Sequence, residues 1–363
     1  MTVGLRWLRA SIALVATCPL GPLAPLRPLL GQDTSATRDT TPPPPPGHFH
    51  VGLTINDWGV SLGNAPRVNG IRVNVEDAGL ERVNGVNITV WKPREPLTGS
   101  VNGLALGIVG PGAAELNGAQ VGLAGVVAER HVRWLSVGGL GVVSQGAIEG
   151  VSVGGLGVVA EGGIRGIALA GLGVVAQGEV RGLVIAGLGA VTQRDLSGLT
   201  VAGLGAVAEG DLRGLVVGGL GAVSQGRLTG VGISALAVVA EQGIDGLGLS
   251  GLATVATGNI HGVAFGGLAV VSGRTIAGVS VAGYRVAATR LAGLSLAGLT
   301  VTTRDMDGLS LSAYNRVRGL QRGLAIGLYN SADQLNGVQI GILNRAKNNR
   351  APFKILPILN VQL

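Results

Sequence analysis

The hydrophobic pattern of the chain is a sixteen-residue unit that occurs nine times in succession between Leu135 and Gly278, without an insertion or a deletion. In each unit the first and third positions are large and apolar, aliphatic in all cases but Phe265, the fourth and fifth are small, and the sixth is Leu. The fourteenth is Ile, Val or Leu, and the sixteenth is Gly. A unit this short cannot bury its own apolar face and must stack on its neighbours. The pattern therefore predicts a single repeat domain that grows in one dimension.

The ninth position is Val in all nine units. Identical residues at a fixed period stack on one another when the units stack in register. We therefore expect a structural ladder formed by Val143, Val159, Val175, Val191, Val207, Val223, Val239, Val255 and Val271.

Looser copies of the unit flank this regular block on both sides. Each of the first four copies follows an Asn-Gly dipeptide, which readily takes positive φ and so predicts a tight corner. Extra residues around 92–96 predict a loop. Counted together, eighteen units of 14–18 residues, mostly 16, fill residues 71–350, the irregular ones starting at Ile71, Val86, Leu104, Ala119, Val279, Leu294, Leu309, Leu324 and Val338.

Strands are favoured over helices because every unit is rich in β-branched residues and contains too much glycine for a stable helix. Sixteen residues with a Gly-bearing turn suit one coil of an all-β solenoid. We expect positions one and three to point inward on a first side, six and nine to fill a second, and fourteen a third. Eighteen coils about 4.8 Å apart would extend roughly 85 Å.

An antiparallel outer-membrane β-barrel is the alternative fold, because a strand of ten residues and a turn of six also make sixteen. Membrane barrels alternate apolar and polar side chains and carry aromatic girdles. The regular block is instead apolar or small on both faces, and Phe265 is its one aromatic residue. These features favour the solenoid.

The two ends of the chain have different compositions. Residues 1–32 are typical of an export signal, with Arg6 and Arg9 before a short, proline-broken apolar stretch. Its Cys18 is the one cysteine of the chain, which leaves open a lipidated cysteine. A proline-rich linker (residues 33–47) and an N-terminal cap with strand-like alternation (residues 48–70) follow. Residues 351–363 form a C-terminal cap, because Pro352 and Pro357 cannot extend a hydrogen-bonded ladder.

The net charge is +7, but the basic residues are scattered and no basic run is interleaved with aromatic residues. This pattern argues against nucleic acid as a partner. On an exported protein, diffuse positive charge serves solubility or attracts anionic envelope lipid or glycan. The sequence identifies no single partner, and once the signal is removed it contains no transmembrane helix.

The ends of the array carry a resemblance to a known family. The segments NGVQIGILN (Asn336 to Asn344) and RGLAIGLYN (Arg322 to Asn330), with the closing PFKILPILNV (Pro352 to Val361), resemble the NG-L-Q-I-G-L-x-N repeats of the leptospiral surface-repeat family. The central block departs from this pattern, because small or aliphatic residues replace the Gln and the Asn. The resemblance implies export and surface or outer-membrane association in a diderm bacterium. It implies no known activity, catalytic residue or cofactor.

Candidate chemistry is sparse. His48 and His50 are the closest pair of metal-ligand type, and we expect a surface pair rather than a metal site. The acidic residues near the turns change position between units, so a fixed carboxylate pair for glycan hydrolysis is not expected. Three tyrosines either fill a widening core or form an aromatic strip that faces a ligand: Tyr284, Tyr314 and Tyr329.

The sequence thus predicts a noncatalytic, exported β-solenoid without a cofactor or a metal site, in the periplasm or at the cell surface. Its expected role is a structural or adhesive scaffold that binds an envelope component or glycan. The alternatives are an outer-membrane barrel acting as a pore or anchor and, more remotely, a polysaccharide-degrading β-helix.

Overall fold

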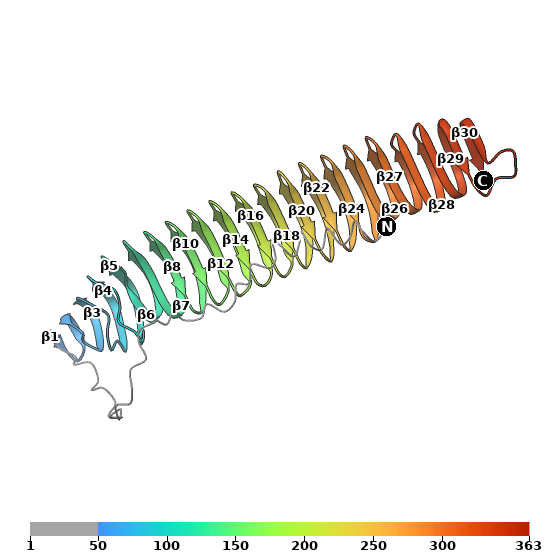
Figure 1. The fold of residues 1–363 in the computed structure, drawn as a ribbon. Helices are drawn as coiled ribbons and strands as arrows, with labels where there is room; N and C mark the ends of the chain where they lie inside the picture. The colour runs from blue at the N-terminus through green and yellow to red at the C-terminus, as the bar shows by residue number, and fades with distance from the viewer. Residues whose placement is uncertain (1–49, 363) are drawn as a thin grey trace, which may run out of the picture. The chain divides into compact units, whose positions relative to one another are not determined.

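The computed structural model describes residues 50–362. The expected export signal (residues 1–32), the linker (residues 33–47) and His48 lie outside the described residues. The described part contains thirty β-strands and no helix, and its coils stack into a β-solenoid of about 17 turns (Figure 1). This confirms the fold class predicted from the sequence.

Strand pairing excludes the barrel alternative. β11 (Ile164–Ala170) pairs in parallel with β9 (Ala147–Gly154) on one side and with β13 (Val180–Ala186) on the other. Each of its residues faces the residue sixteen positions before or after it. An antiparallel barrel needs every neighbouring pair to run in opposite directions. Among the described strands only two pairs do so, one at each end of the stack.

Each regular coil contains one long and one short strand. The long strand runs from position thirteen or fourteen to position four of the next unit, and the short strand spans positions seven to ten. Besides those named above, the long strands are β15 (Leu196–Ala202), β17 (Leu212–Gly218), β19 (Arg227–Ser234), β21 (Gly243–Ser250), β23 (Asn259–Gly266) and β25 (Thr275–Ala282). The short strands are β8 (Gly141–Ser144), β10 (Gly157–Ala160), β12 (Gly173–Ala176), β14 (Gly189–Thr192), β16 (Gly205–Ala208), β18 (Gly221–Ser224), β20 (Ala237–Ala240), β22 (Ala253–Ala256) and β24 (Ala269–Ser272).

The irregular coils lie at the two ends. The N-terminal ones contain β1 (His50–Ile55), β2 (Trp58–Gly63), β3 (Arg67–Asn74), β4 (Arg82–Thr89), β5 (Ser100–Gly107), β6 (Gly112–Gly122) and β7 (Gly125–Gly138). The C-terminal ones contain β26 (Arg285–Ala297), β27 (Thr300–Leu311), β28 (Tyr314–Ile326), β29 (Tyr329–Ala346) and β30 (Ile355–Gln362). β1 closes the first coil by pairing antiparallel with β2, and β30 closes the last by pairing antiparallel with β29. The expected loop at 92–96 separates β4 from β5.

The interior is lined by the even-numbered positions two, four, eight, ten and fourteen. Position fourteen supplies the largest buried side chains, from Ile148 to Ile276, as expected. The expectation that positions one, three, six and nine point inward was wrong. The valine ladder does form in register, but its side chains face outward, and Val143 is 43% exposed. The two walls of the coil approach too closely to hold more than one row of large side chains.

The glycine at position sixteen forms a column along the long strands. Its members from Gly59 to Gly337 have φ between 101° and 151°, a region that side chains other than glycine rarely occupy. A Cβ added at any of these glycines, Gly166 for example, would overlap the backbone carbonyl of the coil before it. The positive φ of these glycines therefore turns the backbone in a way that brings each Cα against the carbonyl of the neighbouring strand and leaves no room for a side chain.

Positions two and eight face each other across the interior, and their volumes compensate. Three consecutive coils have a larger residue at position two, Val184, Thr200 and Val216, and Ala at position eight. The coils with Gly232 and Gly248 at position two have Val238 and Thr254 at position eight. A Cβ added at Gly248 would lie 3.0 Å from Thr254 Cγ2. In each coil the side chains at positions two and eight together fill the same interior space, but the share that each wall contributes differs.

Polar side chains replace this apolar filling near the ends. Arg72 is fully buried and its Nη1 donates to Asp77 Oδ1 at 2.7 Å. Burial lowers the pKa of Arg72, and its pairing with Asp77 opposes that shift. At the other end, Asn315, Asn330 and Asn344 form an interior ladder of amide hydrogen bonds, 2.8 and 2.7 Å long. The asparagine of the family-like motif is therefore an interior residue.

The tyrosines do not fill a widening core. Tyr284 is 53% exposed and replaces the leucine of position six, because it lies one coil after Leu268. Tyr314 is also exposed, and its ring stacks on that of Tyr329 with centroids 4.9 Å apart. The core-filling interpretation was wrong for these side chains.

We expect Ala222→Val to destabilise the solenoid by about 1–3 kcal/mol, because it adds volume opposite Val216. The compensating pair Val216→Ala and Ala222→Val should recover most of that loss. Urea unfolding of the two single variants and the double variant measures the coupling between the two positions. Strictly additive effects would show that the two side chains do not share one space.

Candidate functional site

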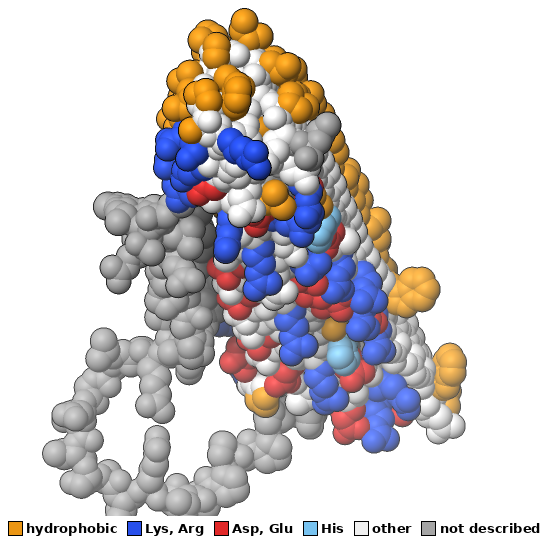
Figure 2. All heavy atoms as spheres, turned by 90° about the vertical axis from the view of Figure 1, so that its right-hand side faces the viewer, with side chains coloured by type: hydrophobic (Ala, Val, Ile, Leu, Met, Phe, Trp, Pro, Cys, Tyr) orange, Lys and Arg blue, Asp and Glu red, His pale blue; other side chains and the backbone are white. Residues whose placement is uncertain are grey.

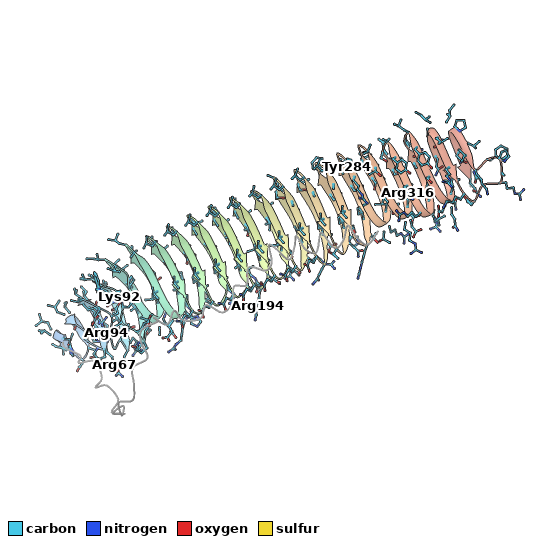
Figure 3. All side chains as sticks on the ribbon, viewed as in Figure 1. Arg67, Lys92, Arg94, Arg194, Tyr284 and Arg316 are labelled. Atoms are coloured by element: carbon cyan, nitrogen blue, oxygen red, sulfur yellow. The ribbon has the colours of Figure 1, made fainter. Side chains whose placement is uncertain are left out.

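The regular coils separate polar from apolar residues around their circumference. Every Asp, Glu and Arg between Leu135 and Tyr284 occupies one of positions eleven to fifteen. We call this turn and the first residues of the following strand the polar edge. The outward positions one, three and nine are aliphatic throughout this block except for Phe265 at position three, and five and seven are Gly or Ala. In Figure 3, Arg194 projects from the polar edge and Tyr284 from the opposite edge.

The opposite edge, at position six, carries a continuous row that we call the leucine edge. Its leucines are between 42% and 57% exposed. Orange side chains line the margin of the space-filling view, away from the band of charged residues (Figure 2). A continuous exposed apolar surface without a charged residue usually marks an interaction site. The row in the regular block is Leu140, Leu156, Leu172, Leu188, Leu204, Leu220, Leu236, Leu252 and Leu268.

The backbone at the leucine edge has its hydrogen bonds within the protein. The amide of Leu172 donates to the carbonyl of Leu156 at 2.8 Å, and the amide of Gly173 donates to the same carbonyl at 3.1 Å. Leu188 and Gly189 repeat this pattern one coil later. The amides of this turn therefore have their hydrogen-bond partners within the protein and need none from water.

The polar edge is held by carboxylates that accept backbone hydrogen bonds from the next coil. Asp195 Oδ1 accepts from the amide of Asp211 at 2.9 Å, and Asp211 Oδ1 accepts from the amide of Arg227 at 2.8 Å. The hydrogen bond from Arg227 is the main reason that the pKa of Asp211 is lowered. Partial burial raises the pKa of Asp245, but hydrogen bonds from Arg227 and His261 outweigh it, so this pKa is also lowered.

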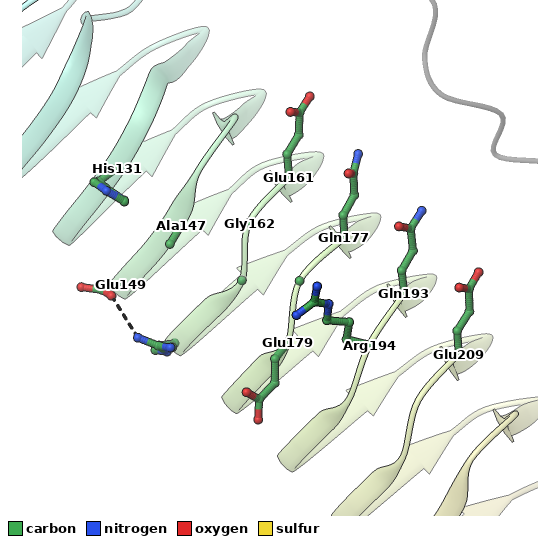
Figure 4. A pocket seen from close by; sticks show the side chains of 13 residues that line it. His131, Ala147, Glu149, Glu161, Gly162, Gln177, Glu179, Gln193, Arg194 and Glu209 are labelled. Atoms are coloured by element: carbon green, nitrogen blue, oxygen red, sulfur yellow. Dashed lines mark hydrogen bonds and ion pairs between the residues drawn. The ribbon is translucent and has the colours of Figure 1, made fainter.

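A shallow groove of about 690 Å³ runs along the polar edge. One wall is the row Glu161, Gln177, Gln193 and Glu209, which point the same way from successive coils (Figure 4). Across the groove Glu149 pairs with Arg165 at 3.4 Å, and the floor consists of glycines. Carboxylates and amides in a regular row can hydrogen-bond an extended polar ligand.

The carboxylates of this row do not form a hydrolytic pair. Glu161 and Glu209 are three coils apart, roughly 14 Å at the usual strand spacing. The two carboxylates of a glycosidase are about 5–9.5 Å apart. Among the described residues no three His, Cys, Asp or Glu side chains are grouped as metal ligands would be. Of the predicted histidine pair, the structure describes only His50, which lies at the start of β1.

Trp134 departs from the glycine column. It takes the place of the glycine between Gly118 and Gly150, and its φ is 82°. A bulky residue with positive φ is strained, by about 1–3 kcal/mol. The side chain gains little packing in return, since it is 75% exposed. It stands between the charged position fifteen and the aliphatic position one, at the border of the polar edge.

Positive charge is concentrated in the C-terminal coils. Residues 285–363 contain ten Lys and Arg but three Asp and Glu, a difference of +7 that equals the net charge of the whole chain. The regular coils between Leu135 and Tyr284 contain six Arg and eight acidic residues. The expectation of diffuse positive charge was wrong, because the excess of positive charge belongs to one end of the stack.

Comparison with protein-family models, curated proteins and solved structures gives no match. The resemblance to the leptospiral surface-repeat family therefore stays a prediction from the terminal motifs. Within residues 50–362 no helix has the length and hydropathy needed to cross a lipid bilayer.

Replacing Trp134 by glycine should stabilise the solenoid by about 1 kcal/mol, because glycine takes the φ of this column without strain while gaining some entropy in the unfolded chain. Thermal unfolding of wild type and Trp134→Gly measures the difference. Gly150→Ala is the matched control in the same column and should destabilise. A lower melting temperature for Trp134→Gly would mean that the indole contributes more packing than its exposure indicates.

We expect Asp211→Ala to destabilise the fold by about 1 kcal/mol at neutral pH, because the amide of Arg227 loses its acceptor. The lowered pKa of Asp211 means that this stability is complete above the ordinary value of 3.8 and is lost as the pH falls through the folded-state value. Urea unfolding at several pH values should show the gap between variant and wild type closing in acid. The exposed Glu241 supplies the control variant Glu241→Ala, and a pH-independent gap for Asp211→Ala would contradict this assignment.

Proposed function

We propose that the chain is a noncatalytic, exported repeat protein of a diderm bacterial envelope, which acts as a scaffold that binds an envelope component. The supporting observation is the uninterrupted apolar surface of the regular coils. From Leu135 to Tyr284 the outward positions one, three, six and nine contain no charged residue. Scattered apolar residues need no explanation, but a continuous patch of this kind does.

The geometry of this surface suits an extended partner. The same side chain recurs once per coil, at a strand spacing of about 4.8 Å. Small ligands are instead usually bound in concave, largely apolar pockets. A partner with its own repeat, or a continuous layer, can engage many coils at once, so weak contacts add up.

The polar groove supports glycan as a second candidate partner. The row of Glu161, Gln177, Gln193 and Glu209 presents acceptors and donors at regular intervals, as sugar hydroxyl groups require. Its two carboxylates are too far apart for hydrolysis by the usual pair, so we propose binding rather than cleavage.

Cell fractionation tests the export and envelope association of the full chain in a diderm host. We expect the wild-type chain in the envelope or periplasmic fraction, shortened by removal of about the first 32 residues. A variant without residues 1–32 should stay in the cytoplasm. Mass spectrometry of the N-terminus identifies the processing site and any lipid on Cys18.

A chain that stays in the cytoplasm with an intact N-terminus would contradict the proposed function. An exported chain that is freely soluble in the periplasm, and sediments with no envelope component, would contradict the scaffold role but not export.

A further inference from the structure

The apolar surface of the regular coils covers three sides at once. Positions one and three form the outer face of the long strands, position nine forms the outer face of the short strands, and the leucine edge joins them. A folded partner that docks on one flat face would leave the other face and the edge in water. A fluid apolar medium covers all three sides together.

The length of the apolar part of each strand matches the thickness of one leaflet of a bilayer. Positions one to four and seven to ten are each four residues long, roughly 13 Å at the rise of a β-strand. One leaflet contributes half of a hydrocarbon core that is about 30 Å thick. Backbone hydrogen bonds run from coil to coil, including those of Leu172 and Gly173 at the turn. No backbone amide of this turn needs water as its partner.

Side chains at the border between the polar edge and the apolar faces are also of the kinds found at the surface of a bilayer. Trp134 projects where the polar edge meets the apolar face, and tryptophan favours the interface between headgroups and acyl chains. The net charge of +7 on residues 285–363 complements anionic headgroups at one end of the stack.

We propose that the regular coils lie in one leaflet of an anionic lipid bilayer, with the leucine edge toward the bilayer centre and the polar edge among the headgroups. The partner is thus a lipid layer, and this inference rests on the proposed role as an envelope-binding scaffold. The protein neither spans the membrane nor encloses a channel in this arrangement. The protein lies along the membrane over its length, as an amphipathic helix does, but it is built from strands.

Cosedimentation of the purified full chain with vesicles tests the proposal. The vesicles consist of phosphatidylcholine with a minor fraction of phosphatidylglycerol. The triple variant Leu172→Lys, Leu188→Lys and Leu204→Lys places charge on the leucine edge, at side chains already half exposed. We expect it to bind vesicles at least about tenfold more weakly than wild type, because each lysine would have to enter hydrocarbon.

The matched control adds the same three charges to the polar edge, outside the groove: Gln145→Lys, Gln225→Lys and Gln242→Lys. It should bind anionic vesicles as tightly as wild type or more tightly. Circular dichroism shows whether both triple variants keep the wild-type fold. Equal binding by the two variants, or no binding by wild type, would overturn the proposal.

A second measurement does not depend on the folding of the leucine variant. Emission from Trp134, taken as the difference between wild type and Trp134→Phe, should shift to the blue on vesicle binding. Lipids with a quencher high on the acyl chain should quench it more than lipids with a quencher near the bilayer centre. Unchanged emission from Trp134 on vesicles would contradict the proposed orientation.

Two further results separate this inference from the proposed function. A concentration-dependent dimer that the leucine variant abolishes, without vesicle binding, would identify a second copy as the occupant and overturn the lipid proposal. Envelope association in cells without vesicle binding would also refute the lipid proposal, while leaving the scaffold role intact. Vesicle binding by a chain that stays cytoplasmic would support the lipid affinity and contradict the envelope role.

Discussion

The whole structure depends on parallel hydrogen bonding between coils in a register of sixteen residues. Because residue i always pairs with residue i + 16 in the regular block, residues at the same position of the unit stack on one another from coil to coil. Glycine at position sixteen makes this possible, since a Cβ there would overlap the carbonyl of the preceding coil. A coil that must stay this thin has room inside for one row of large side chains. The remaining aliphatic residues are therefore displaced to the surface, where they become available to a partner.

The sequence alone predicted the repeat and the all-β solenoid, because a fixed period and frequent glycine are visible in the sequence. The tight corner predicted at each Asn-Gly dipeptide was wrong, because these dipeptides lie within long strands such as β3, where the glycine has positive φ but the strand continues. The sequence also did not predict which positions face inward. We expected the aliphatic residues of positions one, three, six and nine to lie inside, whereas positions two, four, eight, ten and fourteen line the interior. The inward row at position fourteen was predicted correctly, and Ile148 and its equivalents are the largest buried side chains of the regular coils. Side-chain size does not predict burial in a fold whose walls lie this close together.

The candidate surface was harder to predict than the fold. Segregation of charge to positions eleven to fifteen can be read from the sequence, but its meaning depends on knowing that positions one, three, six and nine face outward. The buried Arg72 was missed because its partner Asp77 lies in a loop that the repeat pattern does not describe. Trp134 was missed too, because the looser repeats hid the fact that it occupies a glycine position.

Trp134 also marks a seam between two kinds of repeat. Before it, Asn69, Asn84, Asn102 and Asn117 form an outer ladder of amide hydrogen bonds. After it, the uniform coils begin and that ladder is replaced by charged and small side chains. In a one-dimensional stack each coil contacts only its neighbours. The indole of Trp134 is therefore a natural fluorophore at a defined point of the stack, on the boundary between the two kinds of repeat.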